Sequence, residues 1–286
     1  MTTPSSPFPL GRGGEPQRAG VGFLLPYLAV LSARFRMGLQ YRSAAFAGLC
    51  TQLFWGMIRI AIFSAFYRST LHAQSMTLSD TMTYVWLGQA MFAILPWQVD
   101  PDVQSMIKTG TVAYELLRPV DLYSLWFTRA FGQRIAPLLL KAVPMLTIAA
   151  IFMHLKPPAT WQCGVAWMTA TFLAAILASV ISALMTISLL WTTTGDGIAR
   201  LLPVFAYSLS GMDVPLVFFP NWSHPLLYAL PFRYLVDFPF RLYLGKFPMS
   251  DWPALFGQEI AWIVALVILG RVLVARGRRK LVLQGG

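Results

Sequence analysis

The stretch 161–190, WQCGVAWMTATFLAAILASVISALMTISLL, contains no charged side chain. A helix needs about 20 consecutive apolar residues to cross the hydrocarbon core of a bilayer, so this stretch is longer than one crossing requires. The whole chain of 286 residues is apolar, with 57% hydrophobic and only 12% charged residues. Soluble domains contain about 25% charged residues. The composition therefore predicts an integral membrane protein, and it argues against disorder, nucleic-acid binding and a secreted disulfide scaffold.

Five further apolar runs are near the length of a membrane-spanning helix. Few charged side chains interrupt them, among them Arg59 in the first run and Lys141 in the third. Together with the opening stretch, they predict an all-α integral membrane protein with six transmembrane helices. The five runs cover residues 44–67, 81–99, 130–153, 198–219 and 254–274.

The distribution of basic residues predicts which side of the membrane each connection faces. The chain has 22 Lys and Arg against 11 Asp and Glu, and membrane proteins retain basic residues in their cytoplasmic connections. With both termini in the cytoplasm, fifteen basic residues fall on the cytoplasmic side and five fall outside. We therefore predict a multi-pass membrane protein with both termini cytoplasmic.

The region before the first span divides into a tail and an amphipathic helix. Residues 1–20 are rich in Pro, Gly and Ser, which predicts a disordered cytoplasmic tail. Residues 22–42 place leucines on one helical face and polar side chains beside it, with Arg34 and Arg36 included. This pattern predicts a helix that lies in the cytoplasmic membrane interface and touches membrane lipids.

A cleaved signal peptide over residues 21–33 is the alternative interpretation of the same region. Leu31 is a poor residue three positions before a cleavage site, and two arginines follow within three residues, so the interfacial helix is favoured. The transmembrane domain is then expected to cover residues 21–280, with 281–286 as a C-terminal tail.

The cytoplasmic connection between the second and third spans, roughly 100–128, is unusually structured. Residues 102–109 can form a short helix that Gly110 stops. Pro119 breaks the following segment, and Asp121 suits the N-cap of the third span. We predict an ordered, amphiphilic elbow rather than an open loop.

The pair Asp100 and Asp102, separated by Pro101, allows two interpretations. It resembles a carboxylate pair for a divalent metal ion, although Mg²⁺ would need further oxygen ligands. It also matches the start of a helix, where aspartate caps backbone amides. We favour the helix start and predict no metal site.

The external connection 212–252 is too apolar for a solvated loop and too often broken for one span. Between Pro215 and Pro248 it contains ten aromatic residues and four prolines. This composition predicts short re-entrant or interfacial helices before the last span. Within it Arg233, Asp237 and Arg241 are spaced so that the aspartate can pair with both arginines.

Sequence motifs for chemistry are scarce. There is no G-x-x-x-x-G-K-[ST] loop, so we expect no ATP binding and no enzyme activity from this chain by itself. The histidines His72, His154 and His224 lie in separate connections without metal-ligand spacing. Cys50 and Cys163 are expected near opposite membrane faces, too far apart for a disulfide. We therefore predict no cofactor bound by this chain.

Arg59 is a charge inside the first span, where charges are costly and often functional. One interpretation is that it contacts an anionic group of a substrate in the transport pathway. The other is structural: the side chain extends toward the outer head groups, or it pairs with an acid such as Glu259 or Asp213. We favour the structural interpretation, and for Lys141 we expect extension toward the cytoplasmic side.

Residues 108–123, KTGTVAYELLRPVDLY, resemble the signature stretch of the permease subunits of ABC-2-type transporters. The resemblance covers about residues 22–280 in outline and implies a half-transporter. Two such permeases, identical or related, would bind two separate ATPase subunits that hold ATP and Mg. The elbow would be the coupling helix, and the interfacial helix would also meet the ATPase. The implied coupling residues are Lys108, Gly110, Glu115, Leu117, Arg118 and Pro119.

The resemblance implies an ATP-driven exporter of a lipid-like, glycolipid, polysaccharide or hydrophobic drug-like substrate. An ion-coupled secondary transporter is one alternative, and it would require carboxylates at mid-membrane. A lipid-linked transferase is another, for which only Asp100 and Asp102 offer a weak signal. Within the elbow we expect Glu115 and Arg118 to lie on one helical face, where they pair with each other or reach the ATPase.

Overall fold

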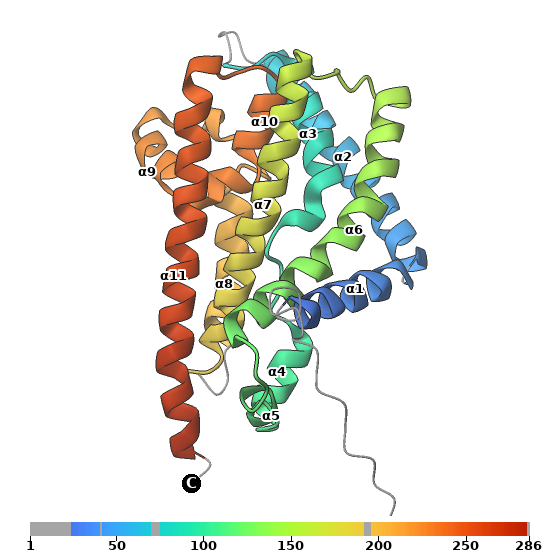
Figure 1. Ribbon diagram of the computed structural model, residues 1–286. Coiled ribbons are helices and arrows are strands. Elements are labelled where there is room, and N and C mark those ends of the chain that lie inside the picture. Colours follow the sequence, from blue (N-terminus) through green and yellow to red (C-terminus); the bar gives the residue numbers. More distant parts are fainter. Residues whose placement is uncertain (1–23, 41, 70–74, 192–195, 285–286) are drawn as a thin grey trace, which may run out of the picture.

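The computed structural model describes residues 24–40, 42–69, 75–191 and 196–284 (Figure 1). The predicted tail at residues 1–20 and His72 lie outside these ranges. Every regular element in the described ranges is a helix, and none is a strand, which confirms the all-α prediction for these ranges.

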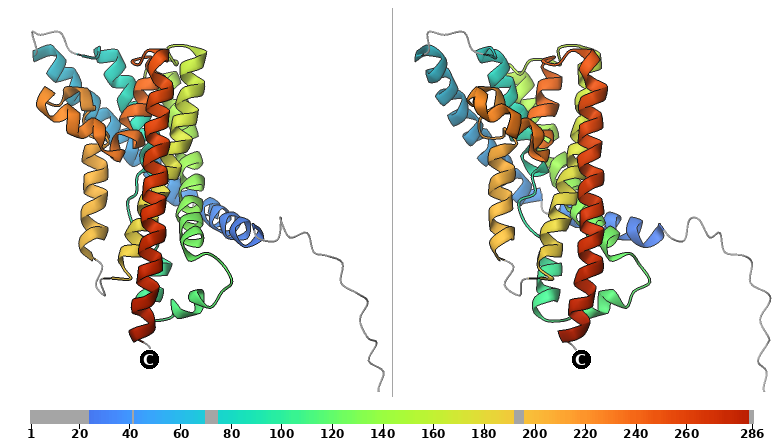
Figure 2. Two further views of the ribbon diagram at one scale, coloured as in Figure 1. Left: turned by 60° about the vertical axis from the view of Figure 1, so that its left-hand side comes forward. Right: turned by 90° about the vertical axis from the view of Figure 1, so that its left-hand side faces the viewer.

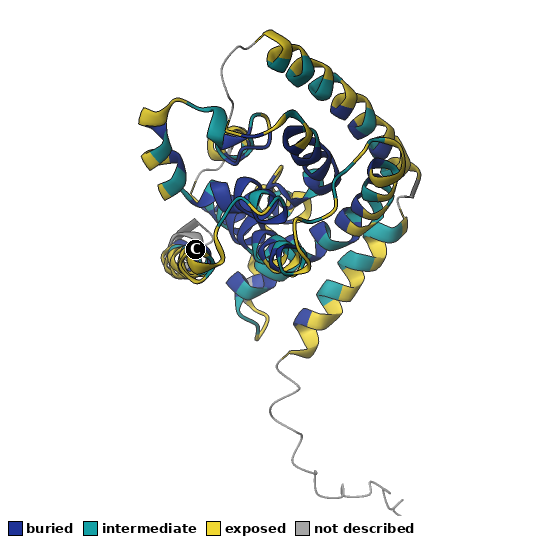
Figure 3. Cartoon of the chain, turned by 90° about the horizontal axis from the view of Figure 1, so that it is seen from above, coloured by how far each residue is buried: buried dark blue, intermediate teal, exposed yellow. Residues whose placement is uncertain are grey.

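Within the ranges that the structure describes, four helices are long and apolar enough to cross a membrane. The helix without charged residues, Trp161–Ser188, lies at the centre: 72% of its most apolar 18-residue segment is buried inside the protein. For the helix that contains Ser43–Ser69 the corresponding share is 6%. The buried face of the central helix carries Ala170, Ala174 and Ala178, and such small residues let neighbouring helices approach closely. Figure 3 shows the buried residues gathered at the centre of the bundle. The four helices are α2 (Arg42–Ser69), α6 (Leu122–Phe152), α7 (Trp161–Ser188) and α11 (Trp252–Gln284).

Two predicted spans are shorter helices than expected. The run 81–99 contains α3 (Leu78–Met91), a turn η1 (Phe92–Ile94) and then extended backbone up to residue 100. Pro96 explains the break, because a proline disfavours helical geometry in the residue before it, and Leu95 has ψ of 150°.

The run 198–219 also differs from one continuous helix. Its helix α8 (Asp196–Leu209) is followed by a turn in which Gly211 has φ of +87°. Residues other than glycine rarely adopt this backbone conformation. The count of six crossings therefore stays a prediction, with four full-length candidates in the described residues.

The N-terminal helix α1 (Leu25–Gln40) lies across the direction of the long helices and packs on the first part of α6 (Figure 1). A Cβ added at Gly38 would lie 2.7 Å from the Cβ of Ala136, so the two helices cross at small residues. Tyr27 adds a polar contact, because its hydroxyl accepts a hydrogen bond from the backbone N–H of Asp121 at 3.0 Å. The helix and its transverse course match the prediction, and its position in a membrane interface stays a prediction.

Short helices connect α8 to α11, as the prolines and aromatic residues predicted. They lie above α8 in both views of Figure 2, and η4 and α10 pack directly on α7. Asp237 pairs with Arg241 at 3.4 Å as expected. Arg233 instead lies over the rings of Tyr228 and Tyr234. The elements are η2 (Leu216–Phe218), η3 (Asn221–Ser223), α9 (His224–Ala229), η4 (Pro231–Leu235), α10 (Asp237–Tyr243) and η5 (Met249–Asp251).

The start of α3 meets two later connections at the end of the bundle opposite the C-terminus, in a group that we call the outer clamp: Asp80, Lys156 and Lys246. The two carboxylate oxygens of Asp80 lie 2.7 Å and 2.6 Å from the Nζ atoms of Lys156 and Lys246. Burial alone would raise the pKa of Asp80, but the hydrogen bonds from both lysines and Thr77 lower that pKa to about 2. The clamp therefore holds a charged carboxylate between the start of α3 and two later connections.

Candidate functional site

The elbow between α3 and α6 contains two short helices, α4 (Pro101–Lys108) and α5 (Ala113–Leu116). Asp100 caps α4, because its carboxylate accepts hydrogen bonds from the backbone N–H groups of Asp102 at 2.9 Å and Val103 at 3.4 Å. Gly110 follows with φ of +75° and ends the first helix. The predicted short helix and its stop are confirmed, and the capping geometry supports the helix-start interpretation of the two aspartates. Among the described residues no group of His, Cys, Asp and Glu could hold a metal ion.

Arg34 joins α1 to the beginning of α4. One of its Nη atoms lies 3.1 Å from Asp100 and 2.6 Å from Asp102, and the Arg34 side chain is largely buried. Arg36, the other arginine singled out from the sequence, is exposed. Helix α1 is thus tied to the elbow by an ion pair that spans 66 positions of the sequence.

Glu115 is buried beneath α5, with 4% of the residue exposed. One carboxylate oxygen bonds to the guanidinium of Arg129, and the other accepts a hydrogen bond from Trp126 Nε1 at 2.9 Å. The pairing of Glu115 with Arg118, one of the two expectations, is wrong, because both carboxylate oxygens of Glu115 bond to residues of α6 and Arg118 is exposed. The reason is the length of α5: one helical turn ends at Leu116, and the chain then folds back so that α6 offers the nearer donors. The contact of Arg118 with the ATPase stays a prediction.

The outer surface of the elbow carries what we call the elbow knob: Lys108, Tyr114, Leu117, Arg118 and Pro119. All five side chains are exposed, Tyr114 by 72% and Leu117 by 81%. Figure 1 shows α4 and α5 projecting at the end of the bundle where α11 terminates. Exposed apolar side chains held on a rigid base are typical of a protein contact surface. Of the implied coupling residues, Gly110 shapes the elbow and Glu115 anchors it, whereas Lys108, Leu117, Arg118 and Pro119 face outward.

A second feature is a cleft of about 390 Å³ between α2, α3 and the end of α8, which we call the Arg59 cleft. Its size is within the range of small-molecule sites in proteins. It combines an apolar wall from α2 with polar groups contributed by all three helices. The lining residues are Thr51, Gln52, Trp55, Ile58, Arg59, Ile62, Gln89, Phe92, Tyr207 and Asp213.

Arg59 is held by three acceptors. Its guanidinium lies 3.0 Å from Asp213 Oδ1 and donates to the carbonyl oxygen of Met212 at 2.7 Å and to the hydroxyl of Tyr207. The Arg59 side chain is 13% exposed and the Asp213 side chain is 59% exposed. The geometry supports the structural interpretation, with Asp213 as the partner. Glu259 is fully buried in α11, and neither of its carboxylate oxygens has a hydrogen-bond partner among the described residues.

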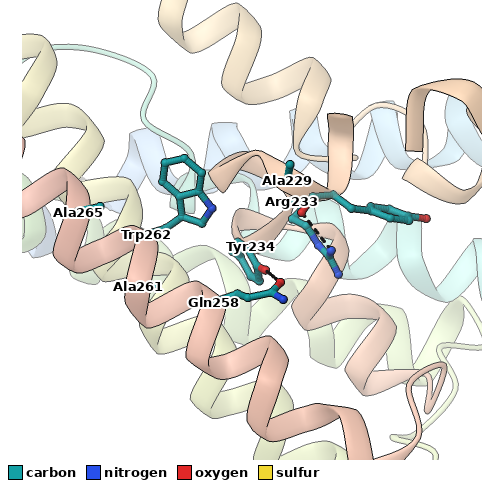
Figure 4. A pocket seen from close by; sticks show the side chains of 8 residues that line it. Ala229, Arg233, Tyr234, Gln258, Ala261, Trp262 and Ala265 are labelled. Atoms are coloured by element: carbon teal, nitrogen blue, oxygen red, sulfur yellow. Dashed lines mark hydrogen bonds between the residues drawn. The ribbon is translucent and has the colours of Figure 1, made fainter. Parts of the chain in front are cut away.

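A third hollow of about 570 Å³ lies between η4 and α11 (Figure 4). Two of its polar contacts are internal: the Tyr234 hydroxyl donates to Gln258 Oε1 at 2.7 Å, and Arg233 donates to the carbonyl oxygen of Tyr228 at 3.3 Å. Arg233 Nε has no hydrogen-bond partner among the described residues.

Two residues of the Arg59 cleft, Gln89 and Tyr207, escaped the sequence analysis. Gln89 interrupts the uncharged run 81–99 with a polar side chain, which is a signal that could have been used. Tyr207 offered none, because aromatic residues are common throughout this chain.

Comparison with known proteins identifies the family. The family model for the "ABC-2 family transporter protein" matches residues 51–285, which include the elbow, the Arg59 cleft and three of the four long helices in full. No curated protein matches the chain. A match over most of the chain, together with its apolar helices, shows that this protein belongs to the ABC-2 transporter family, as a membrane permease component of an ABC transporter.

Proposed function

We propose that this chain is the permease subunit of an ATP-driven exporter whose ATP is hydrolysed by separate subunits. Two copies of the permease, or this chain and a related one, would form the pathway, with two ATPase subunits on the cytoplasmic side. The substrate class that fits an apolar protein of this kind is an amphiphile, such as a lipid, a glycolipid, a lipid-linked polysaccharide or a hydrophobic drug-like molecule. The membrane is the bacterial inner membrane, with both termini in the cytoplasm.

The observation that carries the proposal is the elbow knob on its rigid base. A membrane subunit without a phosphate-binding loop must receive mechanical work from a partner. The buried bonds of Glu115 and the pairing of Arg34 with α4 connect the knob to α6 and to α1. Movement of the knob is thereby passed to a spanning helix, which can tilt between inward-open and outward-open arrangements.

The family assignment argues against both alternative functions, an ion-coupled secondary transporter and a lipid-linked transferase. The capping role of Asp100 also removes the weak signal for transferase chemistry. ATP and Mg are accordingly assigned to the partner subunits and no cofactor to this chain.

The proposal is tested with the tagged chain purified from cells that also express candidate ABC ATPase subunits from the same genome. We expect an ATP-hydrolysing complex, and no hydrolysis by the chain alone. Leu117→Ala should reduce co-purification of the ATPase and ATP-driven transport together, since Leu117 is exposed and touches no core. Leu226→Ala, at a leucine that is 63% exposed on α9, is the matched control and should change neither. ATP hydrolysis by the isolated chain, or full activity of the Leu117 variant, would refute the proposal.

A further inference from the structure

We propose that the Arg59 cleft binds the transported amphiphile through a head group that donates hydrogen bonds and carries no negative charge. The inference rests on the proposed function, because it assigns the substrate contact of that same permease. It differs from the interpretation of Arg59 as the receptor for an anion, which the sequence alone left open.

The cleft is built by a close approach of α2 to α3. A Cβ added at Gly56 would lie 2.5 Å from the ring of Trp86, so only glycine lets the two helices meet there. Beside this contact, Trp55, Ile58 and Ile62 form an apolar wall along α2, with Phe92 across from it. Such a wall suits the hydrocarbon part of an amphiphile.

The positive charge in the cleft is already neutralised. Arg59 uses its donors on Asp213, Tyr207 and Met212, and it is the more buried member of its ion pair. An anionic head group would have to displace the carboxylate of Asp213 and repel it at short range. Recognition of an anion therefore works against contacts that the protein itself makes.

The cleft contains unused acceptors beside the Arg59 pair. The side-chain N–H groups of three lining residues are also without a hydrogen bond to the described residues: Gln52, Trp55 and Gln89. Gln89 is only 2% exposed, and its Oε1 has no hydrogen-bond partner among the described residues. Asp213 uses Oδ1 for Arg59 and Tyr207, while Oδ2 makes no hydrogen bond with the described residues and belongs to a side chain that is 59% exposed. Buried acceptors are normally satisfied, so a ligand that brings N–H or O–H groups completes this site.

Two kinds of head group have this chemistry: an ammonium group and a hydroxyl-rich sugar. Both donate hydrogen bonds to the amide oxygen of Gln89 and to the carboxylate of Asp213. Only the ammonium gains from the negative charge of Asp213 and from the faces of the aromatic rings in the cleft. Removing the negative charge of Asp213 should therefore weaken binding of an ammonium head group more than binding of a sugar head group.

The experiment uses the full-length permease in lipid nanodiscs without any ATPase, so that its outcome is independent of coupling through the elbow. The probes are decylammonium, decyl glucoside and decyl sulfate, each brominated at the end of the chain to quench tryptophan fluorescence. Trp55→Phe removes the reporting ring in the cleft, and the difference between the two proteins gives occupancy of this site. The variants are Gln89→Leu and Asp213→Asn, with Gln162→Leu on α7 as the matched control, and circular dichroism checks that each is folded at the temperature of the binding assay.

We expect decylammonium, decyl glucoside or both to bind at least tenfold more tightly than decyl sulfate. Gln89→Leu should weaken that binding at least fivefold, and Gln162→Leu should leave it unchanged. If Asp213→Asn weakens only decylammonium, the head group is an amine, and if it weakens neither probe while Gln89→Leu does, a hydroxylated head group is supported. Binding of decyl sulfate as tight as that of the other probes, site-specific binding of none of them, or wild-type affinity in both variants would overturn the inference. None of these results would affect the role of the elbow knob.

Discussion

The elbow and the Arg59 cleft are each organised around one arginine–carboxylate pair, but the elbow buries both partners, whereas the cleft buries only the arginine. In the elbow the carboxylate of Glu115 is only 4% exposed, and both of its oxygens are bonded. In the cleft Arg59 is the buried partner, and the carboxylate of Asp213 is 59% exposed with one oxygen unused. A fully satisfied buried carboxylate makes a rigid joint, whereas an exposed one leaves an acceptor for a ligand. In our two proposals, the same pair of residue types therefore serves force transmission in the elbow and recognition in the cleft.

The largest expected effect breaks the joint. Glu115→Ala leaves the guanidinium of Arg129 and the indole N–H of Trp126 without their partner, and removing one member of a buried pair costs about 3–5 kcal/mol. We expect amide hydrogen exchange over residues 113–121 to accelerate by two orders of magnitude or more. Glu115→Gln, which keeps an acceptor for Trp126, should lie between this variant and the wild type. Unchanged exchange in Glu115→Ala would show that the joint is not held by this pair.

The second effect compares the two members of the cleft pair. Asp213→Asn leaves a buried guanidinium with neutral acceptors only, and we expect it to lower stability by about 1–3 kcal/mol. Arg59→Met leaves behind a carboxylate that water already reaches, so the loss should be about 1 kcal/mol or less. Melting temperatures of the two purified variants measure the order. A larger loss in Arg59→Met would contradict the assignment of Arg59 as the structurally constrained partner.

A third, smaller effect concerns pH at the outer clamp. The pKa of Asp80 falls from its ordinary value of 3.8 to about 2 in the folded protein. A lowered carboxyl pKa contributes stability that is complete above about pH 5 and is lost as the pH falls through the folded value. Each of its two pairs involves a partly exposed lysine, so we expect about 0–1 kcal/mol per pair.

The measurement for the clamp is the melting temperature of the wild type and of Asp80→Asn between neutral pH and about pH 2.5. The difference between the two proteins should be constant down to about pH 5 and should shrink below about pH 4. A difference that grows toward low pH would mean that the carboxylate is not the stabilising form. Unlike the elbow pair, this clamp joins the start of α3 to two later connections at the far end of the bundle, so the elbow should be unaffected.

The smallest effect on stability is expected for Arg118→Ala. Arg118 is exposed on the elbow knob, and substitutions at such positions usually change stability by no more than about 0.5 kcal/mol. Transport and stimulation of the ATPase should nevertheless fall, because the side chain belongs to the surface offered to the partner. The comparison with Glu115 is informative. A variant that is stable but does not stimulate the ATPase would show that Arg118 contributes to the contact surface, whereas Glu115 holds that surface in place. Wild-type coupling in Arg118→Ala would remove this residue from the contact.

Local rules were sufficient for several features of the fold. The four long helices follow from apolar runs of sufficient length, and Asp121 caps α6 as its position before an apolar run predicted. The stop at Gly110 and the broken segment before α11 also follow from the sequence, because glycine and proline act on their immediate neighbours. Neither of the apolar runs 81–99 and 198–219 is one continuous helix. Their hydropathy predicts a span, but Pro96 and Gly211 interrupt the helical backbone.

The partners of the charged residues were decided by the tertiary structure. Sequence spacing suggested Arg118 for Glu115, whereas folding places Arg129 and Trp126 against it. For Arg59 the sequence narrowed the acids to Asp213 and Glu259, and only the packing of α8 beside α2 and α3 selects Asp213, 154 positions away. Helical spacing rules apply to residues three or four positions apart in the chain. They therefore cannot predict which helices pack against each other. The sequence by itself thus determined the class of protein, its apolar helices and its family, while the rigid joint and the open acceptors of the cleft exist only because distant helices pack together.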